Sequence, residues 1–372
     1  MPARRLVVSL LLVVSPLVLV PAVPSGQIDP KSALLGRAGW DALAAGRVEA
    51  AASAFREALA ADPNNARLHL GAAMAAALQR RDEDARRECE RALAIDQTVT
   101  EARALLGQLL YRLGDLQGAI RVYESLAAEA PSDQSARASL ERWRREAELH
   151  GRMQEAVGSH FTVSFEGPEE AALAAHAIES LDRAYWRIGQ LLSVYPTRAI
   201  PVILYTGEQF RDITRSPAWA AAAYDGTIRV PMRGALAKVE ELDRVLSHEF
   251  THALIRTLAA RGVPTWLNEG LAGALETDAP GCPECEANKP AVQLPRKFSL
   301  RGLPASFGRF SDAQAQAAYA VSATAARRLL EEAGGVAVAN LLRDLGEGIP
   351  FDTAFEHRMQ RSFADFEASL RQ

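Results

Sequence analysis

A 34-residue spacing between small residues and prolines constrains the fold of this chain more than any other feature. Pro63 and Pro131 lie 68 residues apart, which is twice 34, and Gly39 and Gly107 keep the same offset. A middle copy continues the phase, with Ala85 in register. A fixed period of this length indicates repeated pairs of helices, each of which buries its apolar face only by stacking on its neighbours.

The pattern resembles the tetratricopeptide repeat, in which small residues stand where helices cross and a proline follows the second helix. Three copies cover about residues 32–133, and a helix over 135–150 is expected to cap the array. The resemblance implies an all-α solenoid over 32–150. Its concave surface would bind a peptide or partner protein, while a rigid spacer or a dimerisation block explains the repeats equally well.

The first 25 residues have the form of an export signal. Arg4 and Arg5 precede an almost wholly apolar run over 6–20, and small residues follow it. This run is shorter than the roughly 20 residues that cross a bilayer, and Pro16 interrupts it. We therefore expect residues 1–25 to be a signal peptide and the mature protein to be periplasmic or secreted. An uncleaved membrane anchor is the alternative.

Length and composition indicate two folded domains rather than one. The chain has 372 residues, 48% of them hydrophobic and 24% charged, which is typical of globular proteins. Its net charge is −4, and it has no dense run of Lys and Arg. A nucleic-acid-binding role therefore lacks the basic surface that it needs.

The second part of the chain, about 158–372, begins with strand patterns and becomes helical. The apolar alternation and the turn residues predict strands over 160–166, 199–206 and 225–232, with helices over 168–192 and 208–214. Helices dominate from 236 onward. Strands followed by helices predict an α+β domain with a small sheet at its N-terminal end. Pro231 favours an edge position for the third strand, because proline cannot donate to the ladder.

A predicted helix over 239–259 carries the strongest chemical motif of the chain. His248 and His252 stand four residues apart, so both imidazoles leave the same helix face one turn apart and can bind one metal ion. Glu249 follows the first histidine, beside the coordination position that a water would occupy. A third protein ligand is still required.

The stretches "HEFTH" and "WLNEGLA" resemble the peptidase MA-like gluzincins, zinc metallopeptidases that are often joined to tetratricopeptide repeats. The resemblance covers about 158–372. It implies one zinc ion per chain, held by His248, His252 and Glu269, with Glu269 on a helix over 264–276. Glu249 would be the general base of peptide hydrolysis by a zinc-activated water. No aminopeptidase motif precedes the metal helix, so we expect an endopeptidase.

The oxyanion formed during hydrolysis would need a further hydrogen-bond donor. On a helix over 315–330, Tyr319 resembles a position at which a helix of the family returns towards the site, and a core tyrosine is the alternative interpretation. The strand that contains Pro231 is a candidate for pairing with an extended substrate. The repeats would bind a partner or the substrate.

One position departs from the gluzincin pattern. Thermolysin-like gluzincins carry an acid four residues after the ligand glutamate, where it orients a histidine, and this chain has Gly273 there. Another residue must then orient the histidines, and Asn268 is the candidate. The departure favours a second hypothesis, in which the chain binds metal without turnover and acts as a repeat scaffold in envelope protein assembly. The presence of Glu249 argues against it.

The three cysteines do not form a disulfide framework. Cys282 and Cys285 stand in a "CPEC" loop without further ligands for a zinc knuckle and without the strand-to-helix setting of a redox motif. A local disulfide that ties this loop is the interpretation we favour. Cys89 falls at a helix position that should be buried, as an inert thiol.

Overall fold

The computed structural model describes residues 30–167, 170–214, 223–224, 226–231, 239–277, 299–304, 306–307 and 310–370. The predicted export signal and the loop with Cys282 and Cys285 lie outside these residues. Among the described residues, no helix combines the length and the apolar character that crossing a membrane requires.

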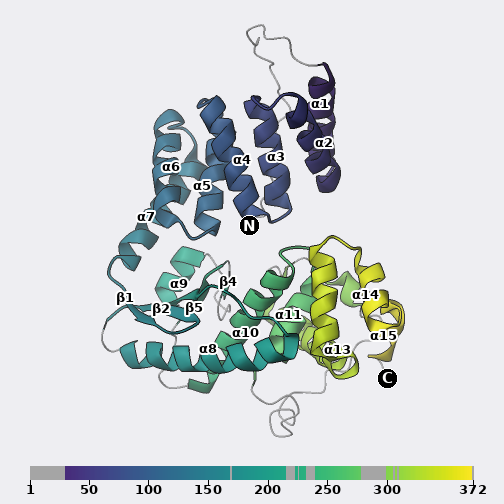
Figure 1. The fold of residues 1–372 in the computed structure, drawn as a ribbon. Helices are drawn as coiled ribbons and strands as arrows, with labels where there is room; N and C mark the ends of the chain where they lie inside the picture. The colour runs from purple at the N-terminus through teal and green to yellow at the C-terminus, as the bar shows by residue number, and fades with distance from the viewer. Residues whose placement is uncertain are drawn as a thin grey trace, which may run out of the picture.

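Seven helices in an antiparallel stack form the N-terminal region (Figure 1). They pair as predicted from the 34-residue phase, and the expected cap is the seventh helix. Their bounds are α1 (Pro30–Ala44), α2 (Val48–Ala61), α3 (Ala66–Leu78), α4 (Asp82–Ile95), α5 (Thr100–Arg112), α6 (Leu116–Glu129) and α7 (Gln134–His150). We call α1–α7 the repeat array and residues 154–370 the C-terminal region.

In the first and third repeats, a glycine of one helix packs against an aromatic ring of the next helix, and this contact recurs after 68 residues. A Cβ on Gly39 would lie 2.8 Å from the ring of Phe55, and one on Gly107 would lie 2.3 Å from the ring of Tyr123. Only glycine lets the two helices approach this closely. The middle repeat has Ala73 and Cys89 in these places, both fully buried in one apolar cluster. The burial of Cys89 confirms the prediction, and it raises the pKa of the thiol to about 12.

A five-stranded mixed sheet follows the array. Three parallel strands form its centre, namely β2 (Phe161–Phe165), β3 (Ile200–Tyr205) and β5 (Ile228–Pro231). The antiparallel strands β1 (Gln154–Val157) and β4 (Ala223–Tyr224) form the two edges. The sequence did not predict β1, because this strand is mostly exposed and lacks apolar alternation.

The predicted edge position of the strand that contains Pro231 is wrong. β5 pairs with β3 on one side and with β4 on the other, so β4 is the edge strand. The pairing with β4 involves only Ile228 and Arg229 of β5. Pro231 therefore lies beyond the residues of β5 that pair with β4, so the N–H group that proline lacks is not needed for a hydrogen bond to β4.

The two faces of the sheet are covered by different helices. Along β3, Val202 and Leu204 point into the main core, which contains residues of α8 (Ala171–Leu192) and α10 (Val239–Leu258). Ile203 and Tyr205 point the other way, into a smaller cluster with residues of α7 and α9 (Gly207–Thr214). β3 is therefore buried on both faces, as its apolar run predicts.

The remaining helices complete the main core on one side of the sheet (Figure 1). They are α11 (Thr265–Ala274), the short 3₁₀ helix η2 (Leu300–Gly302), α13 (Asp312–Gly346), α14 (Phe351–Met359) and α15 (Phe363–Ser369). The helix predicted over 315–330 is the first part of α13. Gly334 has a φ of 78° and kinks this helix.

Buried polar contacts join the repeat array to the C-terminal region. Glu146 of α7 is almost fully buried; it accepts a hydrogen bond of 3.0 Å from Arg229 of β5 and one of 2.8 Å from Tyr111 of α5. At the end of α7, a hydrogen bond of 2.8 Å joins His150 to the buried hydroxyl of Tyr205. The helix expected as a polar cap is thus also the connection between the two regions.

A second set of ion pairs joins the array to the end of α10. Asp82, at the start of α4, accepts two hydrogen bonds from Arg112 of α5 and lies 3.8 Å from Arg256 of α10. Glu49 of α2 pairs with Arg261, which follows α10. The array therefore contacts the C-terminal end of the helix that carries the HExxH motif.

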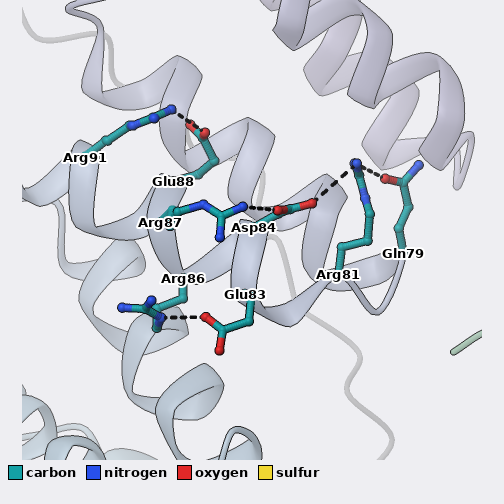
Figure 2. Close-up of polar contacts among 8 residues, drawn as sticks. All are labelled: Gln79, Arg81, Glu83, Asp84, Arg86, Arg87, Glu88 and Arg91. Carbon is teal, nitrogen blue, oxygen red and sulfur yellow. Dashed lines mark hydrogen bonds and ion pairs between the residues drawn. The ribbon is translucent and has the colours of Figure 1, made fainter. Parts of the chain in front are cut away.

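The exposed face of α4 carries acids and arginines in alternation (Figure 2). Arg86 pairs with Glu83 at 3.0 Å, Arg91 with Glu88 at 2.8 Å, and Arg87 with Asp84. Exposed pairs of this kind contribute little to stability. Each arginine drawn on this face has an acidic or amide partner.

We predict that Glu146→Ala lowers the free energy of unfolding by about 3 kcal/mol, because it removes a buried carboxylate that pairs with the buried guanidinium of Arg229. Denaturant unfolding followed by circular dichroism measures this change. Glu148→Ala on the same helix is the control, since its side chain is 74% exposed and it should change stability by less than about 0.5 kcal/mol. Equal effects of the two substitutions would contradict the prediction.

The pH dependence of stability should carry a contribution from His150. Burial, with a smaller effect of Arg229, lowers the pKa of His150 to about 4. Protonation then favours the unfolded chain, so this contribution is complete above about pH 6.5 and is lost as the pH falls towards 4, by on the order of 2 kcal/mol. Melting temperatures of wild type and His150→Gln between pH 7.5 and 4.5 test this: the variant should lose less stability over the range.

Candidate metal centre

The two histidines of α10 leave the same face of the helix, as the four-residue spacing predicts. Their rings lie 4.9 Å apart at 80° to each other. Both side chains are mostly buried, with 20% of His248 and 13% of His252 exposed. The opposite face of α10 is held in the main core by Leu246, Phe250 and Leu254, so the helix cannot rotate its histidines away.

A tight turn brings the predicted third ligand to the same place. Gly262, between α10 and α11, has a φ of 83°, and a Cβ there would lie 2.6 Å from the carbonyl oxygen of Leu345. α11 then begins after Pro264 and packs back against α10. Its Glu269 places one carboxylate oxygen, Oε2, 3.8 Å from Nε2 of His248 and 3.6 Å from Nε2 of His252.

These distances fit a single small cation. Ligands about 2.0–2.2 Å from a tetrahedral zinc ion lie about 3.4 Å from one another. The two histidine–glutamate distances, 3.8 and 3.6 Å, exceed that edge by only a few tenths of an ångström. Two imidazoles and one carboxylate are also a common donor set for catalytic zinc. The structure therefore brings His248, His252 and Glu269 close together, and their donor atoms are of the kind that zinc accepts.

Glu249 lies beside this donor set and has a different environment. Its carboxylate and the ring nitrogens of His248 and His252 lie within 4.8 Å of one another. The side chain is buried, with 6% of the residue exposed, and burial raises the pKa of its carboxyl group. A raised pKa brings a carboxylate closer to the range in which it accepts and returns a proton at neutral pH.

The electrostatics of the centre favour positive charge between the helices. Burial opposes the charge of His248, but the neighbouring carboxylates of Glu269 and Glu276 outweigh this effect and raise the pKa of His248 to about 10. For Glu269, burial is likewise outweighed, here by the two histidines, so that its pKa lies well below the usual range. The carboxylates that favour a proton on His248 would also stabilise a divalent cation.

The partners of the ligands differ from the sequence-based expectation. Asn268, the candidate for orienting a histidine, instead donates a hydrogen bond of 3.2 Å to Oε1 of Glu269. The carboxylate beside Nδ1 of His248 belongs to Glu276, at 3.6 Å. The sequence contains one signal for Glu276: it stands seven residues after Glu269, which in a continuous helix is two turns along the same face. It does not suffice alone, because α11 ends at Ala274.

The close packing of α13 explains why no acid occurs at Gly273. A Cβ on Gly270 would lie 2.3 Å from the carbonyl oxygen of Ser322, and the Cβ of an alanine at Gly273 would lie 3.1 Å from that of Ala323. Both glycines therefore face α13, and a side chain at position 273 would press on Ala323 of that helix.

Tyr319, the proposed oxyanion donor, lies on α13 and packs edge-on against Phe307, with ring centroids 5.1 Å apart. Burial raises the pKa of its hydroxyl, and the charges of Glu269 and Glu249 raise it further. The hydroxyl therefore keeps its proton and stays a hydrogen-bond donor.

The other histidines among the described residues have partners that give them structural roles. His69 contacts Glu88 and the carbonyl oxygen of Pro63, His160 contacts Asp182, and His176 contacts Asp243. None of them takes part in a cluster of metal-binding type within the described part of the chain.

Comparison with known families identifies the repeats. The tetratricopeptide repeat family matches residues 42–109 and 83–143, so the N-terminal region contains tetratricopeptide repeats, as the sequence predicts. A search of curated proteins found none that matches the chain. The residues of the candidate metal centre lie outside the matched ranges.

Several solved structures also resemble part of the chain. The first tetratricopeptide repeat domain of Spaghetti (RPAP3), bound to an HSP90 peptide, is 23% identical, with 32% of this chain and 96% of that chain covered and a TM-score of 0.31. The Arabidopsis OM64 repeat domain is 20% identical, with 31% and 96% covered and a TM-score of 0.30. The Sgt2 repeat domain from Aspergillus fumigatus is 24% identical, with 35% and 88% covered and a TM-score of 0.32.

We predict that the purified protein binds about one zinc ion per chain through His248, His252 and Glu269. Elemental analysis after dialysis measures the occupancy. The His248→Ala, His252→Ala double variant should lose the metal, because one carboxylate alone holds zinc weakly. His176→Ala, which removes a half-buried histidine of α8 whose acidic partner is Asp243 of α10, should retain it. Full occupancy in the double variant would contradict the assignment.

Proposed function

We propose that this chain is a zinc-dependent peptidase, in which the C-terminal region hydrolyses peptide bonds and the repeats bind the substrate or a partner protein. One observation carries the proposal: His248 and His252 from α10 and Glu269 from α11 meet at distances suited to one zinc ion, with Glu249 beside them. The resemblance of the HExxH stretch to gluzincins supports the same conclusion.

Each residue of the centre has a distinct part in this proposal. When bound, zinc supplies a Lewis acid that polarises a carbonyl group and acidifies water. The buried Glu249, whose pKa is raised, accepts a proton from the attacking water and returns it to the leaving amine. Tyr319, whose hydroxyl stays protonated, donates a hydrogen bond to the developing oxyanion.

The contact between the repeats and α10 supports a link between binding and hydrolysis. Tetratricopeptide repeats are protein-interaction modules, and here the start of α4 contacts α10 through Asp82 and Arg256. Arg256 stands four residues after His252, one turn along the helix. A protein bound to the array would therefore be held next to the helix that carries the centre. This arrangement fits an endopeptidase that acts on a recruited protein.

A repeat scaffold that binds metal without turnover is the second candidate. The comparisons favour it over the peptidase in one respect, because the family that matches the chain is an interaction module and its matched residues, 42–109 and 83–143, do not include the metal centre. Gly273, in place of the acid expected from gluzincins, also favours it. In both hypotheses the protein is exported, periplasmic or secreted, with an N-terminal anchor as the alternative to signal cleavage.

We predict opposite effects of two conservative substitutions. Glu249→Gln should keep the zinc and the melting temperature but lower cleavage of an unstructured protein by at least about 100-fold, because the general base is removed. Glu269→Gln should lose zinc, because a neutral amide is a much poorer ligand than a carboxylate. Zinc content, melting temperature and cleavage are measured for both. Loss of metal in Glu249→Gln with retention in Glu269→Gln would reverse the assignment.

Substrate capture separates the two candidate functions. Full-length Glu249→Gln is used as bait, and captured proteins are then incubated with zinc-loaded wild type. Cleavage of a captured protein by wild type and not by the variant supports the peptidase. A zinc-loaded wild type that cleaves neither its captured proteins nor a peptide library would support the scaffold.

A further inference from the structure

We infer that Glu276, held in place by Arg244, orients His248 for metal binding and so replaces the acid that is missing at Gly273. The inference rests on the proposed metal centre. It assigns a positioning role to two residues outside the HExxH and NEGLA stretches, and that role is carried by contacts on both nitrogens of one imidazole ring.

The ring of His248 lies between two carboxylates. Its Nε2 lies 3.8 Å from Glu269, on the side of the proposed zinc, and its Nδ1 lies 3.6 Å from Glu276. An imidazole that donates its Nδ1 proton to a carboxylate keeps the lone pair of Nε2 free for a metal. The contact of Glu276 with Nδ1 would therefore favour the tautomer that leaves Nε2 of His248 free, and would hold the ring in this direction.

Arg244 fixes the carboxylate of Glu276. It lies on α10, one turn before His248, and donates a hydrogen bond of 3.1 Å to Oε1 of Glu276. The other oxygen, Oε2, is the one that faces His248. Glu276 is 16% exposed, whereas Arg244 is 55% exposed. The carboxylate of Glu276, which follows α11, thus contacts both Arg244 and His248 of α10.

The backbone before Glu276 is held independently. The carbonyl oxygen of Leu275 accepts a hydrogen bond of 2.9 Å from Arg187 of α8. α11 ends at Ala274, so the chain leaves the helix before Glu276. This departure carries the acid towards α10, while the face of α11 that contains Gly273 remains against α13.

The second histidine has no equivalent support in the described part of the chain. Nδ1 of His252 is buried and makes no hydrogen bond with a described residue. His248 is therefore the ligand whose orientation depends on an acid, and the removal of Glu276 should weaken metal binding through this residue.

Zinc affinity of the full-length protein, measured by competition with a chromophoric chelator, tests the inference. Glu276→Gln should weaken zinc binding about 10- to 100-fold, the usual scale for an outer carboxylate on a metal-binding histidine. Glu276→Asp should recover part of the loss. Glu332→Gln is the matched control: this acid on α13 is 29% exposed and also has two basic partners, both of them arginines, and its loss should leave zinc affinity unchanged.

The zinc affinity of Arg244→Gln distinguishes a positioning role of Arg244 from the effect of its positive charge. By Coulomb attraction alone, the loss of a positive charge near the centre should strengthen zinc binding. Positioning predicts the opposite, a several-fold weaker affinity, because Glu276 is released. Cobalt-substituted Glu276→Gln should also show an altered visible absorption spectrum, since the geometry of the ligands changes. A change in folding stability alone would leave that spectrum unchanged.

The outcomes distinguish this inference from the proposed centre. If Glu269→Gln loses zinc while Glu276→Gln and Arg244→Gln bind it as tightly as wild type, the positioning role is overturned and the metal centre stands. Tighter binding by Arg244→Gln would also overturn the role. If Glu269→Gln retains zinc at wild-type affinity, the metal centre itself is wrong, and the inference falls with it.

Discussion

The close packing of α11 between α10 and α13 is the constraint on which the candidate centre depends. Gly270 and Gly273 let α13 approach α11 so closely that no side chain fits at either position without a shift. α11 can then present Glu269 only towards α10, where His248 and His252 lie. The turn at Gly262 adds a second constraint, because its positive φ and its contact with Leu345 exclude other residues.

The same packing explains how the chain departs from the gluzincin pattern without leaving His248 unsupported. The position four residues after Glu269 lies against α13, where a Cβ would be 3.1 Å from the Cβ of Ala323, so a side chain there would press on this helix. The chain instead leaves α11 at Ala274, and Arg187 and Arg244 hold the segment and the side chain of Glu276. Gly273 is therefore weaker evidence for an inactive protein than the sequence alone suggests, because another carboxylate occupies the same environment.

The repeat array and the C-terminal region are joined by charge rather than by apolar surface alone. Glu146 and Arg229 form a buried pair beneath the sheet, while Asp82 joins Arg112 of the array to Arg256 of α10. Buried pairs of this kind define one relative orientation, since a displaced partner would leave a charge without compensation. Such a junction would hold a bound protein at a set place relative to the metal helix.

The sequence by itself determined the repeat period, the mixed character of the C-terminal region, and the helix with His248, Glu249 and His252, because these depend on local spacing and side-chain chemistry. It could not place β1, which lacks an apolar pattern, or the two-residue strand β4 that removes β5 from the edge. Nor could it show that Glu276 rather than Asn268 faces a histidine. Those features depend on contacts between segments far apart in the chain, and only the tertiary structure decides which side chains such contacts bring together.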